Sequence, residues 1–170
     1  SVVTSALLAH LLFGHSFFDR QLLDRGIDIS QGRGQIEMME QSIHQLASQE
    51  YVRLSKDTRI SQAIKSMTDA EASEAYVISN DNCFLGKVSL HGLLTKSDTK
   101  MVMSALMQNP TRIKHDASLQ QGIEIASEFV GESIPVINLE TDEMLGVLSE
   151  ADLFQAYLAT QSKIIDLEKK

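Results

Sequence analysis

The chain has 170 residues, of which 43% are hydrophobic and 22% charged, a composition typical of one folded domain or two small ones that share a core, and not of a disordered chain. Its formal net charge of −8 and its pI near 5.0 argue against a surface for nucleic acid or anionic membranes. A single cysteine, Cys83, excludes a disulfide framework and a cysteine-based zinc site, and no nucleophile–base motif or metal-ligand spacing of histidines points to an enzyme.

The chain begins with an apolar stretch, SVVTSALLAHLLF, over residues 1–13. This stretch is shorter than the roughly 20 residues that a membrane-spanning helix needs, and it lacks the basic start and the cleavage site of a signal peptide. Two interpretations stay open: it is the end of a longer hydrophobic region, or it is a core helix.

A polar linker with two glycines follows at residues 28–34. The apolar residues of QIEMMEQSIHQLA, residues 35–47, then recur at helical spacing. This pattern predicts a helix that leads into the next element, and KMVMSALMQ, residues 100–108, is its counterpart in the second half of the chain.

The rest of the chain reads as two copies of one unit. A shift of 59 residues superimposes Arg53, Asp57, Gln62, Ile64, Val77 and Ile78 on Arg112, Asp116, Gln121, Ile123, Val136 and Ile137. With one added residue, Leu85, Gly86, Ser89 and Leu93 fall on Leu145, Gly146, Ser149 and Leu153. Identities at the same points of both halves indicate an internal repeat.

Each copy is predicted to contain a strand, a helix, two strands and a helix. In the first copy the strands are expected at 51–54, 75–79 and 83–89, and in the second at 111–113, 134–138 and 143–149. Apolar residues at helical spacing mark the first helix of each copy: Ile60, Ile64 and Met67, then Leu119, Ile123, Ala126 and Val130. We therefore predict an α/β protein whose two units pack on each other.

The segments SIPVIN, residues 133–138, and GVLSEADL, residues 146–153, resemble the motif of CBS domains. Over residues 50–161 the chain is similar to a tandem CBS pair, or Bateman module. The resemblance implies two CBS domains, β-α-β-β-α repeats packed by pseudo-twofold symmetry and preceded by an N-terminal helical segment.

The segment FGHSFFDRQLLDRGI, residues 13–27, resembles the end of the membrane domain of CLC chloride channels and chloride/proton exchangers. The implied organisation is a membrane-domain end at 1–27, a linker and lead-in helix at 28–48, CBS domains at 49–98 and 99–162, and a tail at 163–170.

Ser149 and Asp152 lie where the last predicted strand ends and the last predicted helix begins. Two interpretations of this pair stay open. As a helix cap, Ser149 accepts a backbone N–H while the acidic residues favour the positive end of the helix dipole. As a ligand site, the CBS resemblance implies that Ser149 faces the phosphates and Asp152 the ribose of ATP, ADP or AMP, with no required cofactor and no metal.

The same resemblance implies further contacts to the nucleotide, from Thr111, Ile113, Ser133 and Ile134 of the second copy and from Ser73 to Ala75 of the first. The first copy has Gly92 at the aspartate position, so only one of the two clefts keeps its ribose ligand. Ala72 stands where some CLC relatives stack an aromatic residue on adenine.

The predicted function is a cytosolic regulatory and dimerisation module of a CLC-family channel or exchanger, at the cytoplasmic face of the cell (inner) membrane. Its expected partners are a second copy of the chain and the membrane domain of the same chain, and no nucleic acid. The homodimer is expected to use exposed apolar residues of the last helix: Leu153, Phe154, Tyr157 and Leu158. The alternatives are a free-standing adenylate sensor and a purely structural dimerisation module.

Overall fold

The structure is a computed structural model that describes residues 38–168, so the predictions for residues 1–37 lie outside the described residues. By its contacts the chain divides into two compact units. We call the first the sheet unit, residues 42–117 and 131–149. The second, the helix unit, contains residues 118–130, those from 150 onward and the described residues before 42.

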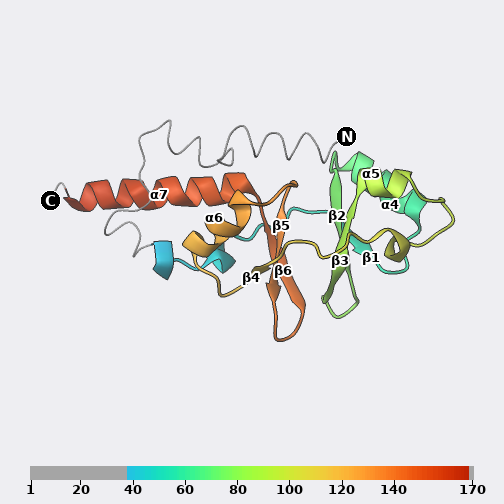
Figure 1. The fold of residues 1–170 in the computed structure, drawn as a ribbon, viewed down its shortest axis with the longest axis horizontal. Coiled ribbons are helices and arrows are strands. Elements are labelled where there is room, and N and C mark those ends of the chain that lie inside the picture. The colour runs from blue at the N-terminus through green and yellow to red at the C-terminus, as the bar shows by residue number, and fades with distance from the viewer. Residues whose placement is uncertain (1–37, 169–170) are drawn as a thin grey trace. The chain divides into compact units, whose positions relative to one another are not determined.

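The first copy of the repeat lies wholly in the sheet unit. It consists of β1 (Arg53–Ser55), α4 (Ile60–Asp69), β2 (Glu74–Ile78), β3 (Phe84–Ser89) and α5 (Leu90–Leu94). Its sheet has the order β1-β2-β3, with β1 parallel and β3 antiparallel to β2 (Figure 1). Helix α4 is the crossover that the parallel pair requires.

The second copy repeats this order with β4 (Ile113–Lys114), β5 (Ile134–Asn138) and β6 (Glu143–Leu148) in the sheet unit, and α6 (Leu119–Ser127) and α7 (Glu150–Glu168) in the helix unit. Both sheets also share one register. Leu54 lies opposite Val77 as Ile113 lies opposite Val136, and each middle strand has an irregularity just after that valine. The structure therefore confirms the predicted fold class.

Two clusters of buried side chains hold the sheet unit together. In the first, residues of α4 and α5 such as Met67 and Leu93 pack on one face of the first sheet, against Val77. In the second, the opposite face of that sheet meets the other sheet, with Tyr76 and Ile78 against Ile137, Met144 and Val147. Their apolar surface is removed from water, which is the main favourable contribution to the fold.

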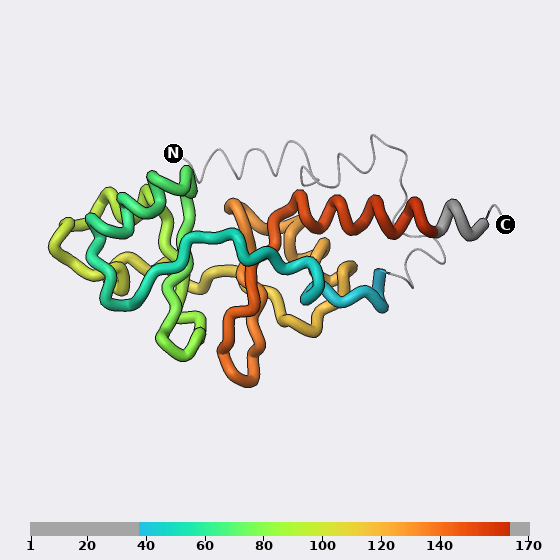
Figure 2. The backbone as a smooth tube through the Cα atoms, turned by 180° about the vertical axis from the view of Figure 1, so that it is seen from behind, coloured from blue at the N-terminus to red at the C-terminus, as the bar shows by residue number. Residues whose placement is uncertain are grey.

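The segments before each copy pair with the sheet of the other copy. These segments contain two short 3₁₀-helices, η1 (Ile43–Leu46) and η2 (Val102–Ala105). Ser48 and Val147 of β6 exchange two backbone hydrogen bonds of 2.8 and 2.9 Å, whereas the Met107 N–H donates to the carbonyl of Lys87 in β3 at 2.8 Å. Figure 2 shows the backbone of both segments from behind. Each segment thus pairs with the sheet of the other copy, as pseudo-twofold symmetry requires.

Gly86 and Gly146 make this close pairing feasible. Both have positive φ angles, 156° and 150°. A Cβ atom at Gly146 would lie 2.7 Å from the carbonyl oxygen of Ser48, and one at Gly86 would lie 2.9 Å from Cδ2 of Leu106. The repeated glycine thus marks the point where the lead-in segment crosses each sheet.

Three predictions about helices were wrong. Helix α6 ends at Ser127, and Val130, placed on its apolar face, is 87% exposed. The lead-in segment is not one helix: after residues 38–40 the chain bends, because Gln41 accepts from Leu119 N–H and Ile43 donates to Ala117 instead of continuing helical bonds.

The third correction concerns α7. Leu153 and Tyr157, expected as exposed residues of a dimer surface, are fully buried, and Phe154 and Leu158 are only half-buried. Within the helix unit α7 packs against α6, so its apolar face is used inside the chain.

Candidate ligand cavity

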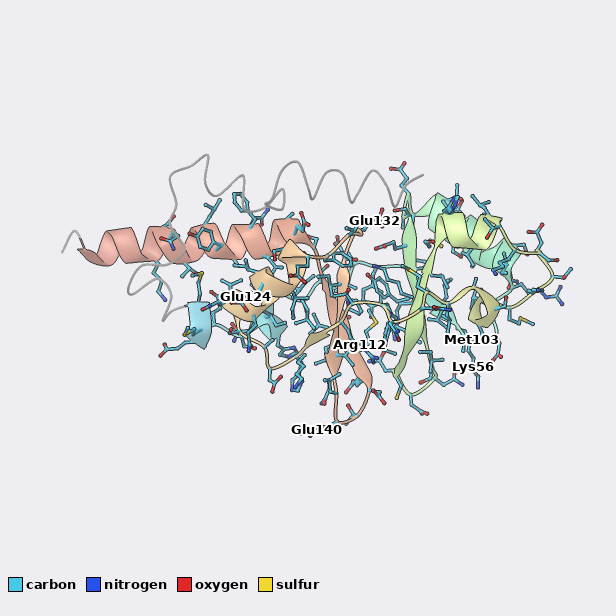
Figure 3. All side chains as sticks on the ribbon, viewed as in Figure 1. Lys56, Met103, Arg112, Glu124, Glu132 and Glu140 are labelled. Atoms are coloured by element: carbon cyan, nitrogen blue, oxygen red, sulfur yellow. The ribbon has the colours of Figure 1, made fainter. Side chains whose placement is uncertain are left out.

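A cavity of about 440 Å³ opens in the sheet unit beside the start of β2. Seven of its lining residues belong to the first copy, and the other two directly precede β5 of the second copy. Its lining consists of Glu50, Tyr51, Val52, Ala70, Ala72, Glu74, Tyr76, Glu132 and Ser133. Figure 3 places Glu132 in the loop before β5.

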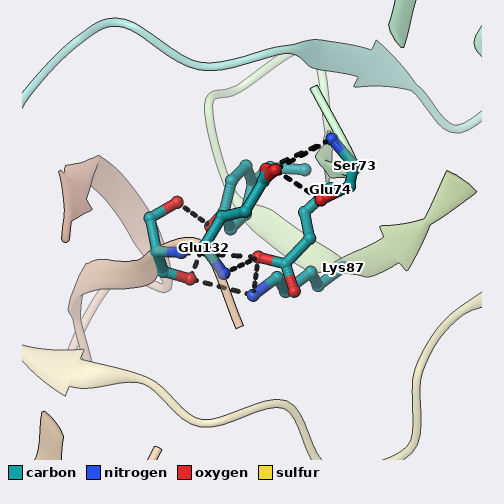
Figure 4. Close-up of polar contacts among 6 residues, drawn as sticks. Ser73, Glu74, Lys87 and Glu132 are labelled. Carbon is teal, nitrogen blue, oxygen red and sulfur yellow. Dashed lines mark hydrogen bonds and ion pairs between the residues drawn. The ribbon is translucent and has the colours of Figure 1, made fainter. Parts of the chain in front are cut away.

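Glu74, which lines the cavity, forms a buried ion pair with Lys87. The Lys87 side chain is only 2% exposed, and its Nζ lies 2.6 Å from Oε2 of Glu74, which is 10% exposed. The same Nζ donates to the carbonyl oxygen of Ser133 at 2.8 Å. Figure 4 draws these contacts. A buried ammonium needs such partners, because its desolvation is otherwise costly.

Backbone groups of the second copy complete the network. Glu74 Oε2 accepts from the N–H of Glu132 at 2.9 Å, and the Glu132 carboxylate in turn accepts from the N–H and hydroxyl of Ser73. The Tyr76 hydroxyl lies 2.8 Å from the carbonyl oxygen of Ser133 and 2.7 Å from its Oγ. The segment 132–133 is therefore held on the first copy from both sides.

Two tyrosines supply the aromatic wall. The rings of Tyr51 and Tyr76 meet edge to face with centroids 5.5 Å apart. A resident cation lies near each ring: the Arg53 guanidinium is 5.9 Å from the Tyr51 centroid, and Lys87 Nζ is 5.6 Å from that of Tyr76. Burial raises the pKa of both phenols, and at Tyr51 the Arg53 charge opposes that shift.

The eight residues singled out from the sequence have different environments. Ser133 lines the cavity, and Ser73 is bonded to Glu132 at its edge. Ala75, Ile113 and Ile134 are buried in the interior, whereas Thr111 is exposed. Ser149 directly follows β6, and Asp152 lies in the first turn of α7, in the helix unit.

Strand register brings part of this set together. Ile134 lies opposite Leu148, so Ser133 and Ser149 are neighbours at the same end of the second sheet. Glu74 and Ser89 are the equivalent pair in the first copy. The grouping of Asp152 with these residues stays a prediction.

Serine capping is visible in the first copy. Ser89 is the N-cap of α5, and its hydroxyl accepts from the N–H of Gly92 at 3.0 Å. Helix α7 begins at Glu150, directly after the equivalent Ser149. A ligand is therefore not needed to explain a serine at this point of the repeat.

Sequence reasoning missed the cavity-lining residues Glu74 and Tyr76 and the ion-pair partner of Glu74, Lys87. The repeat carried a signal for them, because Glu74, Tyr76 and Lys87 stand where the second copy has Ser133, Pro135 and Val147. The first copy has a lysine in an otherwise apolar strand, where the second copy has a valine. Because a buried lysine is rare unless it is paired, this difference predicts a buried partner for it.

Within residues 38–168 no helix is both long and apolar enough to cross a membrane. The same residues contain no group of three or more histidine, cysteine or acidic side chains that would hold a metal ion.

No protein-family model matches the sequence, and no curated protein matches it. Solved structures of the same fold include a CBS domain pair/ACT domain protein from Thermotoga maritima, with 15% identity and a TM-score of 0.62 over 69% of this chain and 97% of that one.

Two further structures are similar. The CBS pair domain of a putative Mg²⁺ transporter from Shewanella oneidensis has 17% identity and a TM-score of 0.63, over 88% of this chain and 86% of that one. The CBS-pair protein CBSX2, known from Arabidopsis thaliana, was solved in complex with AMP and has 16% identity and a TM-score of 0.61, over 71% of this chain and 98% of that one. The chain thus has the fold of a CBS domain pair.

Proposed function

We propose that this chain is a regulatory module, not an enzyme, that senses an adenine nucleotide through its second copy. The CBS-pair fold supports this proposal, and so does the AMP complex of a protein with the same fold. The observation that carries it is the register of β5 and β6, which sets Ser149 beside the Ser133–Ile134 segment. The hydroxyls of Ser133 and Ser149 and the backbone groups of these two segments are suited to hydrogen bonds with a phosphate and a base.

The second copy suits phosphate better than the first does. At matching positions the second copy has the uncharged residues Thr111 and Ser133, and the first has Val52 and the carboxylate Glu74. We assign Asp152 to the ribose hydroxyls, because an ionised carboxylate accepts two hydrogen bonds and the first copy has only Gly92 at that position.

Calorimetric titration with ATP, ADP and AMP tests this assignment. We expect Asp152→Asn to weaken binding by about 10- to 150-fold, the equivalent of one hydrogen bond to a charged group. Ser149→Ala should cost about 1 kcal/mol of stability with or without nucleotide if the serine also caps α7. Equal, flat titrations of the wild type and Asp152→Asn would refute nucleotide sensing and leave a purely structural module.

We further propose that the module is homodimeric and belongs to a CLC-type chloride channel or exchanger, at the cytoplasmic face of the cell membrane. The CBS pair domain of a putative Mg²⁺ transporter shares this fold, and the N-terminal segment resembles the end of a CLC membrane domain. The coding sequence upstream of Ser1 tests this part: a membrane domain there supports it. A start codon at that point would favour the alternative, a free-standing adenylate sensor.

A further inference from the structure

The cavity beside β2 has the wrong charge for a nucleotide phosphate. Three carboxylates line it, those of Glu50, Glu74 and Glu132, and none of its nine lining residues is basic. Lys87 pairs with Glu74 at 2.6 Å. The carboxylates of Glu50 and Glu132 also line the cavity, so a polyphosphate placed there would face like charges at short range.

The remaining wall is apolar and aromatic. Val52, Ala70 and Ala72 contribute small apolar surfaces, and the two tyrosines contribute rings. The positions of Arg53 and Lys87 show that positive charges already lie within 6 Å of both ring centroids. A volume of about 440 Å³ is in the range of small-molecule sites.

We propose that this cavity binds a small organic cation with an apolar body, such as a substituted ammonium. The ammonium group lies against Tyr51 and the carboxylates of Glu50 and Glu132, and the apolar body lies against Val52, Ala70 and Ala72. The two copies of the repeat then select ligands of opposite charge. This inference does not depend on nucleotide binding: it rests on Glu50, Tyr51 and Glu132, none of which is assigned to the nucleotide, although Ser133 borders both sites.

Titration followed by NMR tests the proposal with phenyltrimethylammonium and with tert-butylbenzene, in which carbon replaces the charged nitrogen. We expect the cation to shift the Tyr51 and Tyr76 resonances and to bind more tightly than its uncharged analogue. Tyr51→Leu, which keeps an apolar side chain without a ring, should weaken cation binding by about 2- to 30-fold.

A second variant separates charge from folding. Glu50→Gln removes an exposed carboxylate and should weaken cation binding by up to about five-fold. The control is Glu140→Gln, the same change at an exposed position in the turn between β5 and β6, labelled in Figure 3. It should leave cation binding unchanged.

Three results would overturn the proposal: no saturable binding of the cation, equal affinity for tert-butylbenzene, or an equal loss in Glu50→Gln and Glu140→Gln. Competitive displacement of the bound cation by AMP would also refute the charge argument. Nucleotide sensing by the second copy would survive each of the first three, because its test uses Asp152→Asn.

Discussion

The buried ion pair between Lys87 and Glu74 should be the most sensitive polar contact in the sheet unit. Glu74→Gln keeps the shape of the side chain but leaves the Lys87 ammonium, 2% exposed, without its counter-charge. Removing one partner of a buried pair costs about 3–5 kcal/mol, because the remaining charge stays desolvated. Lys87→Met should cost less, since Glu74 keeps the N–H donors of Glu132 and Ser133.

The double variant distinguishes pairing from burial alone. With both charges removed, an apolar side chain fills the space of Lys87, as Val147, 4% exposed, does at the matching position of the second copy. We therefore expect Glu74→Gln with Lys87→Met to be more stable than Glu74→Gln alone, since apolar replacement of a buried pair is often close to neutral.

Urea denaturation at neutral pH measures these free energies of unfolding, with Glu140→Gln as an exposed control. Costs that simply add in the double variant would show that the two side chains are not coupled. A cost below about 1 kcal/mol for Glu74→Gln, typical of an exposed pair, would refute the burial argument.

Two further predictions concern the repeated glycines and the buried tyrosines. Gly146→Ala should lower the free energy of unfolding by more than Gly86→Ala does. The Cβ at position 146 would meet the Ser48 backbone oxygen at 2.7 Å, whereas the Cβ at position 86 would meet the flexible end of the Leu106 side chain. Parallel urea denaturation that ranks the two variants in reverse would contradict this. Burial raises the pKa of Tyr51 and Tyr76, so above about pH 10 the unfolded chain loses phenol protons that the folded chain keeps, and stability should fall by up to about 1.4 kcal/mol per pH unit for each tyrosine. Tyr76→Phe should flatten that alkaline slope, and an unchanged slope would speak against it.

The elements of the fold could be predicted because their signals are local. Helix periodicity and the repeated Gly86/Gly146 and Ser89/Ser149 pairs each depend on a few neighbouring residues. The end of α6 was misplaced because apolar spacing continues to Val130 although the helix stops at Ser127. Periodicity finds an apolar face, but it does not show where the helix ends or what the face contacts.

The cavity could not be predicted, because its parts meet only after two distant segments pack together. Lys87 and Glu74 depend on the β2–β3 register, and both bond to the segment 132–133 of the other copy. The exchange of lead-in segments was equally hidden. Nothing near Ser48 distinguishes pairing with β6 from pairing with β3, since both strands carry the same glycine.

The exchanged lead-in segments impose an order on folding during synthesis. Ser48 cannot form its hydrogen bonds until Val147, about 100 residues later, has been synthesised. At 5–20 residues per second, this synthesis takes roughly 5–20 s. The first copy, by contrast, is completed once Met107 has reached Lys87. A ribosome-bound intermediate should therefore have one finished sheet and a free upstream strand edge, and slow translation between residues 108 and 147 would prolong its exposure to aggregation.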